Sequence, residues 1–274
     1  MNSFALIGHP LGHSLSPLIH KELFKINNID ALYNLKDIEP NNLTKEFDML
    51  KKLNGFNVTI PHKTDIIPCL DKLDYKAELF GAVNTVKCGD VTTGYNTDCI
   101  GFLRSLEMAN IELKGNVLVC GAGGVSRMFA FESALNKCNV TIAVREKSFG
   151  AANKIKSEIK EKLNAEIRVV KFDDLDEGFD LIINGTPVGM YPNTNNCVVK
   201  KEIVEKSKAV FDAIYNPEET LLIKYAKDAG IKYLNGLPML VWQAAVAEEI
   251  WLDVNFTLED IKKVIEIAKK ELKQ

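Results

Sequence analysis

Short apolar runs alternate with amphipathic stretches along the whole chain. The runs are bounded by glycine, proline or polar residues, which is typical of buried strands. We expect strands at residues 4–7, 31–35, 56–60, 83–88, 116–120, 140–145, 167–172, 180–184 and 208–214. Because strands that alternate with helices form βαβ units, the pattern predicts an α/β protein with parallel sheets.

Helical periodicity fills several of the intervals between these runs. We expect helices at residues 40–53, 75–81, 97–110, 125–136 and 257–272. Thr97 or Asp98 would cap the third of them, and the spacing of Thr257 and Asp260 predicts a capping signature on the last. Residues 88–94 indicate a turn.

The length and charge of the chain limit the number of domains and the kinds of partner that we expect. At roughly 150 residues per domain, a chain of 274 residues predicts two domains. A net charge of −3 gives no reason to bind nucleic acid or an anionic membrane, and no apolar run reaches membrane-spanning length. The N-terminus lacks signal-peptide features and the six cysteines form no C-x-x-C pair, so we expect a cytoplasmic protein with reduced thiols.

A glycine-rich motif begins the second half of the chain. The strand at 116–120 runs into a G-x-G-x-x-[small] sequence made of Gly121, Ala122, Gly123, Gly124, Val125 and Ser126. Gly121 permits a tight turn, Gly123 lets the backbone approach a pyrophosphate, and Ser126 allows close packing of helix on strand. The helix that follows offers free N–H groups to phosphates. We therefore expect a dinucleotide-binding domain after a boundary near residues 104–114.

The residue type at the end of the next strand, 140–145, indicates which of the two nicotinamide cofactors is bound. A basic residue there would meet the 2′-phosphate of NADP, whereas an acidic one would bind the ribose of NAD. Arg145 favours NADP, with Arg127 and Lys147 as helpers, although Lys147 is also explained as a solvated residue at a helix start. Glu146 favours NAD, which we consider the less favoured cofactor.

Two polar segments of the first half carry candidate chemistry. Lys63 follows a strand that breaks at Pro61, Thr59 lies at the same edge, and Asp98 lies at a helix start. A lysine and an aspartate from separate elements can converge on one ketone or hydroxyl and exchange a proton with it. The alternatives are a surface charge for Lys63 and a helix cap for Asp98.

The loop at residues 8–20 is dense in small polar residues. In an extended segment Ser14 and Ser16 would point their hydroxyls the same way and suit a small carboxylate, but a turn in which Ser16 caps a helix explains them equally well. His9 and His13 have metal-like spacing, yet Pro10 and Gly12 lie between them, so we expect no metal site.

The motifs as a set resemble those of the shikimate dehydrogenase family. They run in the family's order through GHPLGHSLSPLIH (8–20), NVTIPHK (57–63), GAVNT (81–85), GYNTDCIG (94–101), GAGG (121–124), NGTPVGM (184–190), DAIYNPEETLL (212–222) and NGLPMLVWQAA (235–245). One such match could be chance, but eight in sequence that span nearly the whole chain are very specific.

The resemblance implies a reaction and a set of residues. NADPH would reduce the C3 ketone of 3-dehydroshikimate to give shikimate, a step of aromatic amino-acid biosynthesis, with Lys63 and Asp98 as the catalytic pair. The implied substrate-binding residues are Ser14, Ser16, Thr59, Lys63, Asn84, Asp98, Tyr215 and Gln243. The implied cofactor residues are Gly121, Ala122, Gly123, Gly124, Val125, Ser126, Arg145, Thr186, Gly236 and Met239.

The resemblance also implies an architecture. An α/β substrate domain would comprise residues 1–104 and be completed by C-terminal helices in 238–274, and a Rossmann-like, doubly wound NADP-binding domain would occupy 105–237, with a cleft between the two. We expect a monomer or homodimer whose partner is a small-molecule substrate.

Three positions depart from the family pattern. Its usual Asn-Arg-Thr is Val-Arg-Glu at 144–146, and Phe149 and Gly150 stand where a second basic residue is common. Glu248 stands where an aromatic residue is frequent, which we expect to affect packing more than chemistry. Two hypotheses stay open beside the main one: a related enzyme that prefers quinate or NAD, and a non-catalytic NADP-binding regulator.

Overall fold

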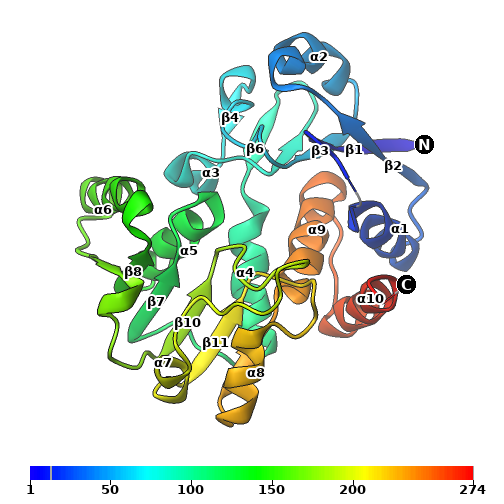
Figure 1. The fold of residues 1–274 in the computed structure, drawn as a ribbon. Coiled ribbons are helices and arrows are strands. Elements are labelled where there is room, and N and C mark those ends of the chain that lie inside the picture. The colour runs from blue at the N-terminus through cyan, green and yellow to red at the C-terminus, as the bar shows by residue number, and fades with distance from the viewer. Residues whose placement is uncertain (13, 274) are drawn as a thin grey trace. The chain divides into compact units, whose positions relative to one another are not determined.

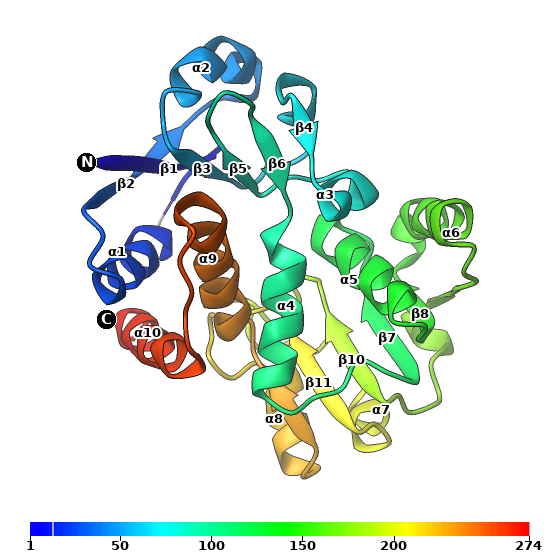
Figure 2. The same ribbon diagram turned by 180° about the vertical axis from the view of Figure 1, so that it is seen from behind.

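Two compact units divide the chain (Figures 1 and 2). The structure, a computed structural model, describes residues 1–12 and 14–273, so His13 of the discounted histidine pair lies outside the described residues. The first unit combines Met1–Phe102 with Pro238–Gln274, and the second is Leu103–Leu237. The sequence predicted these boundaries at residues 104 and 238.

The first unit is built on a six-stranded mixed sheet of order β2-β1-β3-β5-β6-β4. Its strands are β1 (Asn2–Gly8), β2 (Ala31–Asp37), β3 (Gly55–Val58), β4 (Lys72–Leu73), β5 (Thr85–Lys87) and β6 (Thr93–Tyr95). β1 pairs in parallel with β2 and β3, whereas β5 pairs antiparallel with both β3 and β6. The prediction of parallel sheets was therefore wrong only for the pairings of β5, whose connection to β6 is too short to join parallel strands.

Helices from both ends of the chain complete this unit. They are α1 (Ser16–Ile26), α2 (Leu43–Leu50), α3 (Tyr75–Phe80), the start of α4 (Thr97–Met108), α9 (Leu237–Leu252) and α10 (Leu258–Glu271). The predicted helix at 40–53 is a 3₁₀ turn, Pro40–Asn42, followed by α2. The capping box of Thr257 and Asp260 is confirmed, and α10 lies beside α1 in Figures 1 and 2.

Gly101 sets the spacing between α4 and α9. A Cβ at this position would lie 2.8 Å from both the backbone N of Gln243 and the backbone O of Met239. Backbone atoms cannot move away as a flexible side chain can, so only glycine permits this approach. The close contact brings Gln243 within reach of the first turn of α4, where Asp98 lies.

The second unit is a fully parallel sheet of order β12-β11-β10-β7-β8-β9. Its strands are β7 (Asn116–Cys120), β8 (Asn139–Val144), β9 (Arg168–Lys171), β10 (Leu181–Asn184), β11 (Ala209–Asp212) and β12 (Lys232–Leu234). Its helices are α5 (Gly124–Leu135), α6 (Phe149–Leu163), α7 (Lys201–Glu205) and α8 (Leu221–Asp228). This is the doubly wound order, in which the order of the strands reverses between β7 and β10 and ligands gather at the carboxyl ends of the strands.

Each unit buries an apolar core of its own. Strand residues such as Phe56 and Val86 pack with α2 residues in the first unit, and Ile182 and Val210 pack with α8 residues in the second. Among the described residues, no helix is both long and apolar enough to cross a membrane.

Candidate functional site

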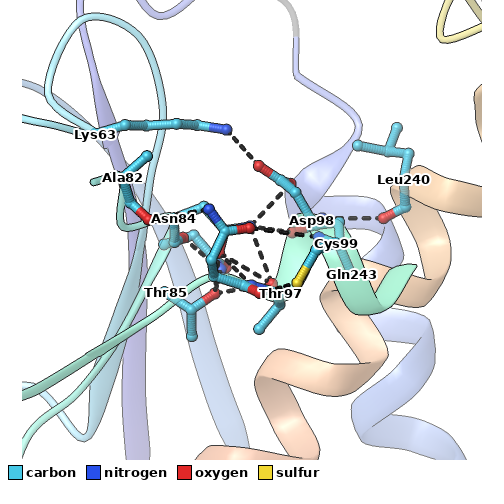
Figure 3. Close-up of polar contacts among 11 residues, drawn as sticks. Lys63, Ala82, Asn84, Thr85, Thr97, Asp98, Cys99, Leu240 and Gln243 are labelled. Atoms are coloured by element: carbon cyan, nitrogen blue, oxygen red, sulfur yellow. Dashed lines mark hydrogen bonds and ion pairs between the residues drawn. The ribbon is translucent and has the colours of Figure 1, made fainter. Parts of the chain in front are cut away.

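Lys63 and Asp98 form an ion pair in the first unit (Figure 3). Lys63 lies in the turn that follows β3, and Asp98 lies in the first turn of α4. The Lys63 Nζ lies 2.6 Å from the Asp98 Oδ2, and the two side chains are 32% and 19% exposed. The pair is therefore preformed and still reachable from solvent, which a proton-exchanging pair requires.

Asn84 holds Asp98 in place. Its Nδ2 donates to Asp98 Oδ1 and to Thr97 Oγ1, both at 2.9 Å, and approaches Gln243 Oε1 at 3.4 Å. Its Oδ1 accepts from the backbone N–H of Thr97 at 2.7 Å. Because an amide has only two hydrogens, the contact with Gln243 is the weakest of the three. Asn84 therefore fixes the start of α4 and one oxygen of Asp98, and leaves the other oxygen to Lys63.

The capping side chain of α4 is Asn96. Its Oδ1 accepts from the backbone N–H of Cys99 at 3.3 Å, which is the contact of an N-cap residue with position N3. The prediction that Thr97 or Asp98 supplies this cap was therefore wrong. The Asp98 carboxylate instead faces the ammonium group and the amide.

A buried hydrogen-bond network continues behind Asn84. Asn57 Nδ2 donates to Thr85 Oγ1 at 2.9 Å and to the Asn84 carbonyl at 3.2 Å. Asn57 Oδ1 faces Tyr33 OH at 2.7 Å and His20 Nε2 at 3.1 Å. His20 Nδ1 in turn lies 2.8 Å from Glu248 Oε1 on α9. The network thus joins α1, β2, β3, β5 and α9 behind the Lys63–Asp98 pair.

The acceptors in this network fix its protonation state. The Asn84 carbonyl only accepts, so Asn57 Nδ2 faces it and Asn57 Oδ1 must accept from His20 Nε2–H. In a neutral imidazole Nδ1 is then an acceptor, and Glu248 must be protonated to donate to it. Burial favours the same state, because it lowers the pKa of His20 to about 3 and raises the pKa of Glu248 to about 10.

Ser14 and Ser16 lie where α1 begins. Ser14 Oγ accepts from the backbone N–H of Ser16 at 3.2 Å, and both side chains are partly exposed. Ser16 is the first residue of α1, and the N-cap position is Leu15 with no side-chain cap, so the interpretation of Ser16 as a cap is wrong. Thr59 is also partly exposed, just beyond β3.

The second unit carries a hollow of about 910 Å³ at the carboxyl ends of its strands. Gly121, Ala122 and Gly123 line one side of it, and Thr186 lines another. Gly121 has a φ of +97°, and a Cβ there would lie 2.7 Å from Thr186 Cγ2. Gly123 has nothing within 4 Å of where its Cβ would be, so this backbone is open to a ligand.

The remaining motif residues support this loop from behind. Ser126 Oγ lies 3.1 Å from the carbonyl oxygens of both Cys120 and Gly185, which closes α5 onto the strand ends. Gly124, Val125 and Ser126 do not line the hollow. Asn184 holds Thr186 through its Oδ1, 2.7 Å from Thr186 Oγ1, and donates to the buried Asp212 at 3.0 Å. Burial raises the pKa of Asp212 to about 6.

The charged residues considered for the choice of cofactor divide into two groups. Arg145, Glu146 and Lys147 line the hollow, together with Lys171 from the end of β9. Arg127 does not line it: its guanidinium pairs with Glu158 at 2.8 Å and stacks over the Phe131 ring. The predicted help from Arg127 is therefore wrong, because its position on α5 turns the side chain toward α6.

Three predicted residues lie elsewhere in the two units. Tyr215 is partly buried just after β11, and burial raises the pKa of its phenol. Gly236 is buried in the second unit, where a Cβ would lie 2.1 Å from the Ala213 carbonyl oxygen. Met239 is buried in α9 of the first unit. In the part of the chain that the structure describes, no cluster of three or more His, Cys, Asp or Glu side chains could hold a metal ion.

Comparisons with known proteins agree with this arrangement. Residues 6–86 match the family described as shikimate dehydrogenase substrate binding domain. The chain is 45% identical over 269 residues to a shikimate dehydrogenase (NADP(+)) of Methanocaldococcus jannaschii, with 95% of this chain and 94% of that protein covered. A second enzyme of that name, from Clostridium perfringens, is 42% identical over 262 residues, with 92% of each covered. The crystal structure of a Thermus thermophilus shikimate 5-dehydrogenase with NADP(H) and shikimate superposes with a TM-score of 0.88 at 31% identity, covering 98% of this chain and 100% of that one.

Proposed function

The chain belongs to the shikimate dehydrogenase family, and we propose that it catalyses the reversible reduction of 3-dehydroshikimate to shikimate with NADPH. The observation that carries the proposal is the Lys63–Asp98 pair, 2.6 Å apart, partly exposed and fixed from behind by Asn84. The buried network holds Asp98 from behind, and the pair itself stays open to solvent, where a ligand can reach it.

The residues of the first unit account for the proton and for the substrate's orientation. Reduction of a ketone adds a hydride to carbon and a proton to oxygen, and NADPH supplies the hydride when it is bound. The Lys63 ammonium donates the proton to the oxygen, and in the reverse direction the lysine amine receives it. Asp98 keeps Lys63 pointed at the reacting oxygen, and Asn84 and Gln243 offer amides to the ring hydroxyls. Ser14 and Ser16 offer hydroxyls to the carboxylate, and Thr59 offers one near the ring hydroxyls.

The second unit fits a dinucleotide. The open backbone at Gly123 and the positive φ of Gly121 suit a pyrophosphate at the N-terminus of α5. Arg145 at the end of β8 lines the same hollow and suits the 2′-phosphate of NADP. Thr186, held by Asn184, lines the opposite side.

One observation favours a second candidate, a relative that uses NAD. Glu146 also lines the hollow, directly after Arg145, and an acidic residue there suits the ribose hydroxyl of NAD. The choice between the two cofactors is therefore a matter of the charges around Arg145, which binding and rate measurements can separate.

Two further features of the protein belong to the proposal. We propose a cytoplasmic location, for which the six free cysteines are suited. We also propose a monomer or homodimer, because the Lys63–Asp98 pair and its supporting network are built from one chain.

Initial rates with matched pairs of substrate and cofactor test the proposal. Purified protein is given shikimate or quinate with NADP or NAD, and formation of reduced cofactor is followed by its absorbance. We expect the highest kcat/KM for shikimate with NADP. A higher value for quinate would change the substrate, and a higher value with NAD would change the cofactor. Cofactor binding without turnover of either acid would indicate a non-catalytic regulator instead.

A further inference from the structure

Lys171 belongs to the edge of the hollow that Arg145 lines, although 26 positions separate the two in the sequence. β8 and β9 pair in parallel, and Val144, the last residue of β8, is in register with Lys171, the last residue of β9. The carboxyl end of β9 therefore places Lys171 beside the point where β8 ends and Arg145 follows. A second basic group is absent at Phe149 and Gly150 in the sequence, and the neighbouring strand supplies one here.

Lys171 pairs with Glu146, the acidic residue that would favour NAD. Its Nζ forms an ion pair with Glu146 Oε2, and this hydrogen bond raises the pKa of Lys171. The two side chains are 46% and 76% exposed, so the pair is readily exchanged for another partner. While this ion pair is formed, the Glu146 carboxylate contacts the Lys171 ammonium group and is not available to a ribose hydroxyl.

The balance of charge at this edge depends on Lys171. Arg145, Lys147 and Lys171 are its cations, and Glu146 and Asp173 are its carboxylates. Without Lys171 two cations would face two carboxylates, and the edge would lose its excess of positive charge. In the part of the chain that the structure describes, the Arg145 and Lys147 side chains have no ion-pair partner, which leaves them available to an anion.

We propose that Lys171 is a specificity residue for the phosphorylated cofactor: it keeps Glu146 from the ribose and binds the 2′-phosphate together with Arg145. This inference rests on the proposed function, since it concerns how that function chooses NADP over NAD. It can be tested by binding alone, because discrimination by the second unit does not require turnover.

Calorimetric titration of the full chain with adenosine 2′,5′-bisphosphate and with 5′-AMP is the test. We expect Lys171→Met to weaken binding of the bisphosphate by roughly tenfold, because one charge-assisted contact is lost. Binding of 5′-AMP should change by less than about twofold, because it lacks the group that Lys171 contacts. Glu146→Gln should retain tight binding of the bisphosphate.

Lys160→Met is the matched control. Lys160 pairs with Glu166 at 2.9 Å, the two side chains are 50% and 69% exposed, and neither lines the hollow. It should leave both affinities unchanged. An unchanged preference for the bisphosphate in Lys171→Met, or an equal loss for both ligands, would overturn the role of Lys171. Either result would leave the proposed function as it is. A wild-type preference for 5′-AMP would overturn both this role and the NADP cofactor of the proposed function.

Discussion

The polar groups of the first unit and the charged groups of the second are held in opposite ways. Behind Asp98, the residues Asn84, Asn57 and His20 are at most 4% exposed, and the Asn57 side chain contacts His20 Nε2 and the backbone carbonyl of Asn84. Around Arg145 the charges are exposed and pair loosely, as Lys171 and Glu146 do. A rigid buried network suits a reacting pair whose geometry must be fixed, whereas a flexible rim suits recognition of a cofactor that must enter and leave.

Of the variants that test this comparison, Asp98→Asn is expected to have the largest effect, and it acts on kcat. Asn84 would still require an oxygen from residue 98, so the new amide nitrogen would face the Lys63 ammonium, donor against donor. We expect kcat to fall by about 100-fold or more, because general acid–base roles are worth that much. Asp48→Asn, which breaks the exposed Asp48–Lys51 pair in the same unit, is the control and should leave kcat unchanged.

Asn57→Leu tests whether the buried network supports the unit itself. The substitution keeps the approximate volume but removes four hydrogen bonds, so that His20 Nε2 and Tyr33 OH lose the Asn57 oxygen that accepts from them. Thr85 Oγ1 and the Asn84 carbonyl lose the Asn57 amide, and each keeps another contact, with Thr97 Oγ1 and with the backbone N–H of Val58 respectively. We expect the free energy of unfolding to fall by on the order of 3 kcal/mol, since each unsatisfied buried group costs ~1–3 kcal/mol. Both tryptophans, Trp242 and Trp251, lie in the first unit, so urea unfolding followed by their fluorescence reports on it.

The control for Asn57→Leu is a surface asparagine in the same unit. Asn54 is exposed, and its side-chain Oδ1 accepts one hydrogen bond, from the backbone N–H of Ser3 at 2.8 Å. Asn54→Leu should change the unfolding free energy by less than ~1.5 kcal/mol. Equal losses for the two variants would show that the network adds no special stability.

Comparison with Glu248→Gln tests whether Glu248 is protonated in the folded protein, through the pH dependence of stability. The folded pKa of Glu248, about 10, lies above its ordinary value of 4.5, so its contribution to stability is present below pH 4.5 and is lost as pH rises toward 10. His20 is neutral in both states above about pH 7, because burial lowers its pKa. Between about pH 7 and pH 9 the wild type should therefore lose stability relative to Glu248→Gln by up to about 1.4 kcal/mol per pH unit.

The measurement for Glu248 is the same urea unfolding, repeated across that pH range. Gln keeps a donor for His20 Nδ1, so the variant should remain folded and active. Glu266→Gln, at an exposed position of α10, should follow the wild-type pH dependence. A wild type whose stability relative to Glu248→Gln does not change with pH would mean that Glu248 is ionised in the folded protein.

Added salt should produce the smallest effect and should act on the second unit. Exposed ion pairs are screened, so NADP affinity should fall by roughly two- to fivefold between about 0.05 M and about 0.5 M salt. NAD affinity should change less, because NAD lacks the 2′-phosphate. Fluorescence titration with each cofactor measures both, and equal losses would argue against a charged rim that selects NADP.

The sequence predicted what depends on neighbouring residues and missed what depends on strand register and distant contacts. The turn at Gly121 was predictable because the whole motif lies within six positions, and Lys63 and Asp98 because strand ends and helix starts collect ligands. Glu248 and His20 are 228 residues apart, so only the packed fold shows that they share a proton. Lys171 joins Arg145 through the pairing of β8 with β9, which no local pattern encodes.

The kinetics of Lys63→Met test the central claim most directly, that the Lys63–Asp98 pair carries the proton. Methionine keeps most of the side-chain length and removes the ammonium group. We predict that kcat for shikimate oxidation with NADP falls by about 100-fold or more, while the dissociation constants of NADP and shikimate change by less than about tenfold. A kcat within about tenfold of the wild type would contradict the account, because another group would then have to move the proton.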